Sequence, residues 1–349
     1  MRIRFISPLL LFLFSLSALA GKVYLTTAVQ LETRYDDNVL QLSEYHLREF
    51  GNNTNPDRYR IESSDDYIST ARLELALKHY LLGGHTQRLN FRVEYDHYWR
   101  NSFMNCCSFG FSLTQYLNRQ LSFQMGYSYD PDKYSDRFLS VLDTSGEYHD
   151  FTYDRNRYYA EIDWRPLPRI DLGYELDYSR LFFNEYFTEY DAALVTHNLR
   201  VKWDAMEYIT VGMRYSYNTA AADAADAFPD PTAISLIKDA THQDDVYLFW
   251  WKCDLSPILK TELSLYNGFK YSEVYFQTEN RDDTYHYSRR DCVKELHNYA
   301  ELPLGNGITA RVFLLSSWRS TSSVFPDVER DKEYNNLQTG IRFYYRFEN

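Results

Sequence analysis

Histidine, serine and aspartate are the residue types of this chain that could carry out hydrolysis. An esterase site needs a serine beside a histidine that a polar partner orients, and a protease site needs acidic residues with a His–Asp couple. The nine histidines are scattered along the sequence. His242 shortly precedes Asp244 and Asp245, so a His–Asp couple of the protease type stays open as an alternative. A hydrolase is therefore one hypothesis, although the sequence gives it little support.

Other catalytic and metal-binding patterns are missing from the sequence. It contains no GxSxG, HExxH, P-loop or dinucleotide-binding fingerprint. Cys106 and Cys107 are adjacent, whereas Cys253 and Cys292 stand far from them, which is neither a zinc-ligand spacing nor a disulfide framework. We therefore predict a protein that is not an enzyme and that uses no metal or cofactor.

Charged side chains follow a different and much stronger pattern. In the stretch "RLNFRVEYDHYWR", residues 88–100, apolar and polar residues alternate strictly, which predicts a β-strand with one apolar and one charged face. About fourteen segments of roughly ten residues show this alternation. The predicted strands are 22–36, 67–81, 87–101, 108–117, 120–130, 153–165, 170–182, 192–203, 208–218, 245–254, 259–276, 288–302, 308–319 and 335–347.

Composition and the first residues indicate export. Arg2 and Arg4 precede an apolar stretch that ends at Ala18-Leu19-Ala20, so we expect residues 1–20 to be a cleaved signal peptide and 21–349 to form one domain. The formal net charge is -12, or about -14 without the two signal arginines, which argues against nucleic acid as a partner. The 33 tyrosines suit strands that meet both lipid and water.

The lengths of the connections favour a membrane barrel over a secreted β-sandwich or propeller. Short connections such as "LNRQ" and "PLPR" alternate with long polar ones such as 37–66 and 219–244. Tryptophans and tyrosines stand at strand ends, as two interfacial girdles require. The girdle residues are Trp99, Tyr129, Trp164, Trp203, Tyr217, Trp251 and Trp318. We predict an all-β, antiparallel, up-and-down transmembrane barrel of about 14 strands, with short periplasmic turns, long extracellular loops and both termini in the periplasm.

Two short pieces of sequence carry a family resemblance. The final "TGIRFYYRFEN" is similar to the C-terminal strand of bacterial outer-membrane proteins, although Glu348 and Asn349 follow the last phenylalanine. "LETRYDDNV", residues 31–39, resembles the first strand of uncharacterised β-barrel porin families, some of them associated with exopolysaccharide export. The resemblance implies an integral outer-membrane location, contact with lipid and lipopolysaccharide, and recognition of the C-terminal strand by the barrel-assembly machinery.

The barrel hypothesis turns the apolar faces toward lipid and the charged faces into the lumen. The predicted basic lumen residues are Arg34, Arg72, Lys78, Arg88, Arg92, Arg100, Arg311, Arg319, Arg342 and Arg346. The predicted acidic ones are Glu161, Asp163, Asp171, Glu175 and Asp177. In a closed ring these sets would form a basic and an acidic wall facing each other. The leading hypothesis is a passive channel for small hydrophilic solutes. The alternative is a non-conducting surface barrel whose acidic loops bind polysaccharide, cations or a partner.

Overall fold

The computed structural model describes residues 23–81, 85–141, 143, 145–224, 238–259 and 261–348. Fourteen strands and three helices make up the elements in these ranges. The strands are β1 (Tyr24–Asp36), β2 (Asp66–Leu81), β3 (His85–Tyr98), β4 (Cys106–Tyr116), β5 (Leu121–Leu139), β6 (Tyr148–Leu167), β7 (Ile170–Phe183), β8 (Ala192–Met206), β9 (Ile209–Ala222), β10 (His242–Asp254), β11 (Ser264–Phe276), β12 (Arg290–Gly305), β13 (Ile308–Ser322) and β14 (Tyr334–Glu348). The helices are α2 (Glu44–Gly51), α3 (Ser256–Leu259) and α4 (Pro326–Lys332).

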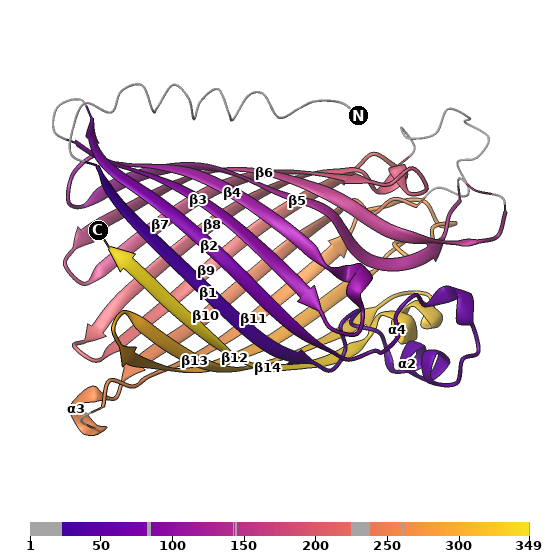
Figure 1. Cartoon of the computed structure of the whole chain (residues 1–349). Coiled ribbons are helices and arrows are strands. Elements are labelled where there is room, and N and C mark those ends of the chain that lie inside the picture. The colour runs from indigo at the N-terminus through magenta and orange to yellow at the C-terminus, as the bar shows by residue number, and fades with distance from the viewer. Residues whose placement is uncertain are drawn as a thin grey trace.

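The strands form one closed antiparallel barrel in which each strand pairs with its sequence neighbours. β1 and β14 close the ring, with a register that runs from Thr26 opposite Glu348 to Asp36 opposite Gln338. Figure 1 shows α2 and α4 at one end of the barrel, and the C-terminus with the short turn that carries α3 at the other. The predicted fold class, an up-and-down barrel of 14 strands, is confirmed.

Alternation fixes which side chains face outward. Leu31 is 55% exposed on the outer face of β1, whereas its neighbours Gln30 and Glu32 are each 6% exposed on the inner face. Trp203 and Trp251 are both paired with Val211, which places them at one level on β8 and β10. Both tryptophans are exposed. The outer surface is therefore a broad apolar band, and polar residues are directed inward.

Two inward-facing glycines are required by the packing of aromatic rings. The Trp250 ring lies so close to Gly212 on the neighbouring strand that a Cβ there would come within 2.2 Å of it. Tyr159 covers Gly126 in the same way, also at 2.2 Å. A ring that lies over a glycine covers backbone that no side chain would otherwise protect. These pairs keep large aromatic side chains close to the wall.

The structure differs from the sequence prediction mainly at the loop end. β5 and β6 run well beyond the predicted 120–130 and 153–165, because the alternation weakens where the strands leave the apolar band. The predicted strand 259–276 begins only at Ser264, and α3 precedes it. The short helices α2 and α4 lie in loops that we expected to be irregular. The predicted signal peptide and residues 225–237 of loop 219–244 lie outside the described residues, and the first alanines of that loop, up to Ala222, belong to β9.

A small apolar core lies among the loops. It consists of Leu42, Tyr59, Ile61, Met104 and Tyr134, all less than a tenth exposed, and Leu47 and Phe50 of α2 pack against it. Ser43 caps α2 by accepting a hydrogen bond from the His46 amide. Residues of the β1–β2 loop, the short β3–β4 connection and the extended end of β5 thus share one core. None of the described helices has the length and apolar character needed to cross a membrane.

A matched pair of substitutions on β5 tests the assignment of faces. Met125 is 48% exposed on the outer face, and its neighbour Gln124 lines the lumen. We expect Met125→Arg to cost about 2–4 kcal/mol of folding free energy in a bilayer, as arginine does near the midplane of a lipid-facing surface. Gln124→Arg should cost much less, because the guanidinium stays in a polar space opposite Glu161. Equal losses in reversible folding into liposomes would contradict the assignment.

Candidate functional site

A cavity of about 870 Å³ occupies the lumen beside the walls of β2 to β8. A second cavity of about 360 Å³ lies nearer the short-turn end and shares Arg88 with the first. Their cationic lining residues are Lys78, Arg88, Arg92, Arg119, Arg157, Arg165, Arg200, Lys202 and Arg346. Their acidic lining residues are Glu74, Asp163 and Asp171. The lining of this part of the lumen therefore carries a clear excess of positive charge.

The five predicted acidic residues on β6 and β7 all lie next to cations of the same strand, of a neighbouring strand or, for Glu161 and Asp163, of β8, whose Arg200 reaches across Gly173 of β7. Arg157 pairs with Asp177 and lies 3.1 Å from Glu175. A cation of β6 is thus in contact with two carboxylates of the neighbouring strand β7. The expected acidic wall is therefore a surface of ion pairs rather than a continuous band of negative charge.

The same pattern holds nearer the short turns. Arg200 reaches Glu161 at 2.9 Å and also pairs with Asp163. Asp171 pairs with Arg165 and lies 3.3 Å from Lys202. Arg157, Arg200 and Lys202 were not among the predicted site residues, although the inward alternation of β6 and β8 could have identified them. What alternation alone cannot supply is the register that brings each cation against a carboxylate.

Most predicted basic residues on the other walls are paired too. Arg34 lies 3.0 Å from Glu32, and Arg342 donates to the same carboxylate at 2.6 Å across the closing seam. Arg72 pairs with Glu94, and Arg311 pairs with Glu301 at 2.5 Å. These contacts hold the arginines against the wall, so their charge is largely balanced.

Arg88 and Arg92 differ from these residues because they form no ion pair with any described residue. Both line the larger cavity, and the Nε of Arg92 is buried without a hydrogen-bond partner. Lys78 and Arg346 line the smaller cavity next to them, where Arg346 donates to the Tyr344 hydroxyl at 3.2 Å. A half-buried cation without a counter-ion attracts a mobile anion more strongly than one in bulk water does.

Two of the predicted basic residues lie elsewhere. Arg100 follows the end of β3, pairs with Asp65, and has its guanidinium 5.9 Å from the ring of the outward-facing Tyr67. It therefore lies on the outer rim, and its prediction as a lumen residue was wrong because the strand ends before it. Arg319 donates to the Lys332 carbonyl at 2.7 Å and so belongs to the loop end of the barrel.

A stacked row of aromatic rings stands on the inner face of β10 to β12. Trp250 and Tyr266 stack with ring centroids 5.7 Å apart, and Tyr266 and Tyr299 stack at 4.2 Å. The guanidinium of Arg311 lies 4.1 Å from the Tyr299 centroid and extends this row to β13. Neither the stack nor its partners were predicted, since alternation shows that these rings face inward and not that they meet.

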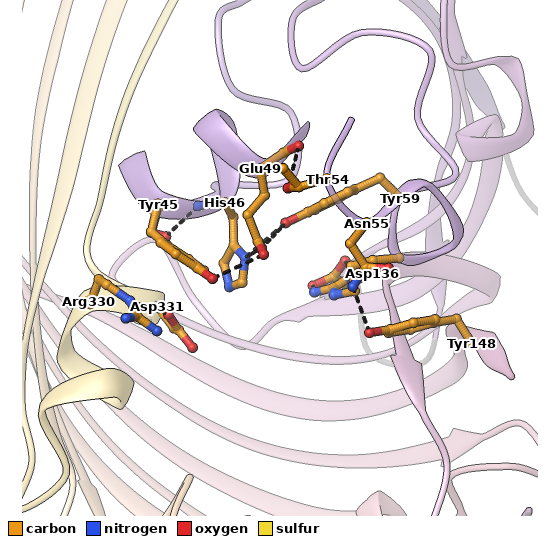
Figure 2. A network of polar contacts seen from close by, with 12 residues as sticks. Tyr45, His46, Glu49, Thr54, Asn55, Tyr59, Asp136, Tyr148, Arg330 and Asp331 are labelled. Atoms are coloured by element: carbon orange, nitrogen blue, oxygen red, sulfur yellow. Dashed lines mark hydrogen bonds and ion pairs between the residues drawn. The ribbon is translucent and has the colours of Figure 1, made fainter. Parts of the chain in front are cut away.

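A third cavity, of about 740 Å³, lies among the loops and is called the loop chamber below. Residues of α2, α4, the β5–β6 hairpin and the loops 184–191 and 277–289 line it. Figure 2 shows Tyr45, His46 and Tyr59 converging on Glu49 of α2. The Glu49 carboxylate accepts hydrogen bonds from both tyrosine hydroxyls at 3.0 Å and lies 3.0 Å from the His46 ring. These bonds lower the pKa of Glu49 despite partial burial.

The loop chamber also holds strongly perturbed titratable groups. Burial raises the pKa of Glu189 to about 7 and lowers the pKa of Lys332, at the end of α4, to about 7. Lys332 Nζ lies 4.9 Å from the ring centroid of Tyr285 and 5.7 Å from that of Phe138. Such shifts are typical of binding sites, where polar groups are held away from bulk water.

Histidines and carboxylates form several pairs at the loop end. His286 lies 2.8 Å from Asp283, and His242 lies 3.5 Å from Asp244. Within the described ranges, the hydrogen-bond partners of histidine rings are carboxylates, tyrosine hydroxyls and one backbone carbonyl, with no serine among them. In those ranges no group of three or more His, Cys, Asp or Glu side chains is placed to hold a metal. The four cysteines are free thiols.

Comparison with solved structures connects this fold to known barrels. The outer membrane channel DcaP of Acinetobacter baumannii matches with a TM-score of 0.50 at 11% identity, over 94% of this chain and 97% of that one. An anion-selective porin from Comamonas acidovorans gives 0.46 at 9% identity, covering 94% and 100%. A bacterial polysaccharide outer membrane secretin gives 0.47 at 14% identity, covering 91% and 98%.

These identities show a shared fold and nothing finer. Searches against family models and curated proteins find no match. The chain is a closed 14-strand barrel of the type found in bacterial outer-membrane porins and channels. The predicted resemblance to barrels of the porin kind is confirmed at this level.

Lys332 gives a pH-dependent prediction for the loops. Its pKa in the folded protein is about 7, below the ordinary value of about 10.4. Above pH 7 the unfolded loop holds a proton that the folded loop has released, so rising pH stabilises the folded loop until about pH 10. We expect Lys332→Met to make the loop more resistant to subtilisin than wild type at pH 7. This advantage should shrink at pH 9, with both proteins compared at the same pH. An advantage that is equal at both pH values would contradict the burial of this charge.

Proposed function

We propose that the protein is an integral outer-membrane channel through which small hydrophilic solutes diffuse passively along a charged lumen. The observation that carries the proposal is the lumenal cavity of about 870 Å³ lined by polar and charged side chains inside a closed 14-strand barrel. A barrel of this strand number has room for a lumen if its side chains and loops do not fill it.

The charges of the lining support a preference for anions. Nine cationic residues line the two lumenal cavities against three carboxylates. Four of these cations, Arg157, Arg165, Arg200 and Lys202, are held in ion pairs with the carboxylates of β6 and β7, whereas Arg88 and Arg92 have no counter-ion among the described residues. The sequence predicted a basic wall facing an acidic wall across the lumen. We propose instead that solutes pass along a lumen whose unpaired charges are largely basic.

The membrane setting is part of the proposal. The apolar outer band contacts lipid, and the loop end faces the cell surface, where its acidic residues meet lipopolysaccharide directly or through divalent cations. Both chain termini then lie in the periplasm, and the C-terminal strand β14 is the element that the barrel-assembly machinery recognises. The signal peptide directs export, and nucleic acid is not a partner of so acidic a chain.

Conductance through planar bilayers tests the channel and its selectivity. Purified protein should give stepwise currents, and the reversal potential across a salt gradient should indicate anion preference. Arg88→Gln combined with Arg92→Gln should shift the reversal potential toward cations. The shift should be larger at low salt, because charges are screened over about 8 Å at physiological ionic strength.

The matched control keeps both charges, as Arg88→Lys with Arg92→Lys, and should leave the selectivity close to that of wild type. Absence of any stepwise current would count against the channel itself. Currents with an unchanged reversal potential in the glutamine variant would instead show that these two arginines do not line the path.

The second candidate function is a surface barrel whose loops close the lumen and bind a partner. The specific observation in its favour is the apolar core shared by several loops, in which Leu42 is 4% exposed. Such a core holds the loops together over the barrel end, which an open pore does not require.

Loosening this core distinguishes the two candidates. Leu42→Ala should cost about 2–5 kcal/mol of loop packing, as leucine truncation does in other cores. If the loops close the lumen, the variant should show larger and longer current steps than wild type. If wild type conducts freely and the variant conducts equally well, the loops do not obstruct the path and the surface-barrel candidate loses its support.

A further inference from the structure

The loop chamber contains two ionisable groups that its own ion pairs and hydrogen bonds leave unused. The other charged lining groups have partners: Arg58 donates to both oxygens of Asp136 at 2.7 and 2.8 Å, and Arg330 reaches Asp331 at 3.0 Å. The Glu49 carboxylate is held by two tyrosines and a histidine (Figure 2). The two unused groups are the ammonium of Lys332 and one carboxyl oxygen of Glu189.

Lys332 offers a positive charge without a counter-ion. No carboxylate of the described residues lies within 4 Å of its Nζ, which is placed between the rings of Phe138 and Tyr285. The backbone of Lys332 is held in place, because its carbonyl accepts the Arg319 Nε–H at 2.7 Å. An ammonium held in aromatic surroundings interacts far more strongly with an arriving anion than one in bulk water does.

Glu189 supplies the second group. The residue is 1% exposed, lies in the turn Thr188–Tyr190, and contributes to the chamber wall, yet its Oε2 has no hydrogen-bond partner. A buried polar atom without a partner costs free energy, so native proteins rarely keep one without a use. In its protonated form this carboxyl can donate a hydrogen bond to a ligand.

The rest of the chamber wall is largely aromatic and aliphatic. Aromatic lining residues are Tyr45, Phe138, Tyr148, Phe151, Phe183, Phe187, Tyr190 and Tyr285. Aliphatic ones are Leu40, Leu42, Leu139, Val141, Leu181, Ala192, Leu194 and Ala220. The wall suits a ligand with an apolar ring body and few polar atoms.

We propose that the loop chamber binds an amphipathic organic anion, an aromatic or alicyclic ring that bears a carboxylate. The ring lies against the aromatic wall, and the carboxylate meets the ammonium of Lys332. The volume of about 740 Å³ falls within the usual range for small-molecule pockets. The proposal concerns binding at the loops and does not depend on whether the barrel conducts.

Binding of 2-naphthoate to the full-length protein in lipid nanodiscs tests this site. Isothermal titration at pH 6, corrected with empty nanodiscs, should show saturable binding of one molecule per chain. Lys332→Met should weaken 2-naphthoate binding about tenfold or more, because it removes the charge-assisted contact. Neutral 2-naphthol, which has the same ring, should bind equally to wild type and this variant.

Matched variants exclude general effects of charge and folding. Arg330→Met removes a cation of the same helix that already pairs with Asp331, and it should change 2-naphthoate affinity less than about threefold. Lys332→Arg keeps the charge and should retain binding. Ala220→Phe, on the β9 part of the wall, places a ring in the chamber and should abolish binding of both compounds, so the site stays testable if Lys332→Met does not fold.

Three results would overturn the proposal. These are no saturable binding to wild type, equal losses in Lys332→Met and Arg330→Met, or full binding in Ala220→Phe. Each can occur with or without channel currents, so failure of this site is distinguishable from failure of the proposed channel.

Discussion

The closure of the backbone hydrogen-bond ladder between β1 and β14 is the constraint on which the rest of the structure depends. Inside a bilayer every backbone N–H and C=O must be paired within the protein, and a closed sheet does this without leaving an edge. Closure also gives each strand one face toward lipid and one toward the lumen. Most charges within the strands then lie inside the ring, where they are either paired with one another or left to attract mobile ions, and outer-face charges such as Glu273 and Arg290 pair with each other near the loop end.

The lumen shows both outcomes. On β6 to β8 the carboxylates pair with guanidinium and ammonium groups of the next strand or, for Glu161 with Arg200, of the next strand but one, which neutralises that wall and fixes the side chains. Arg88 and Arg92 on β3 have no such partner among the described residues, so net charge is concentrated on one part of the wall. The stacked rings of β10 to β12 add a third kind of surface, flat and weakly polar. The inward-facing residues of nearby strands thus decide which lumenal charges are neutralised and which stay unpaired, because side chains on one face of a sheet lie close enough to form ion pairs.

Sequence periodicity predicted the strands well, because a two-residue repeat reports directly on which face meets lipid. The prediction failed beyond the strand ends, where the two-residue repeat no longer reports which way a side chain points. Arg100 follows the last residue of β3 and was given a lumen position by extending the alternation one step too far. Periodicity also says nothing about register, so the pairing of Arg200 with Glu161 and Asp163 could not be seen. The loop chamber was invisible for a related reason, since its residues come from six separate connections whose packing no local pattern encodes.

The loops that carry α2 and α4 meet across the closing seam, although about 280 residues separate them in the chain. Asn38 donates to the Asn335 carbonyl at 3.1 Å, and Asn336 donates to Asp36 at 2.6 Å. These contacts exist only after β14 has paired with β1. The loop end is therefore a late product of assembly, and a barrel whose seam is still open has no finished loop chamber. Protection of these loops from proteases consequently reports on seam closure, which makes the mouth of the barrel a natural marker of a fully assembled molecule.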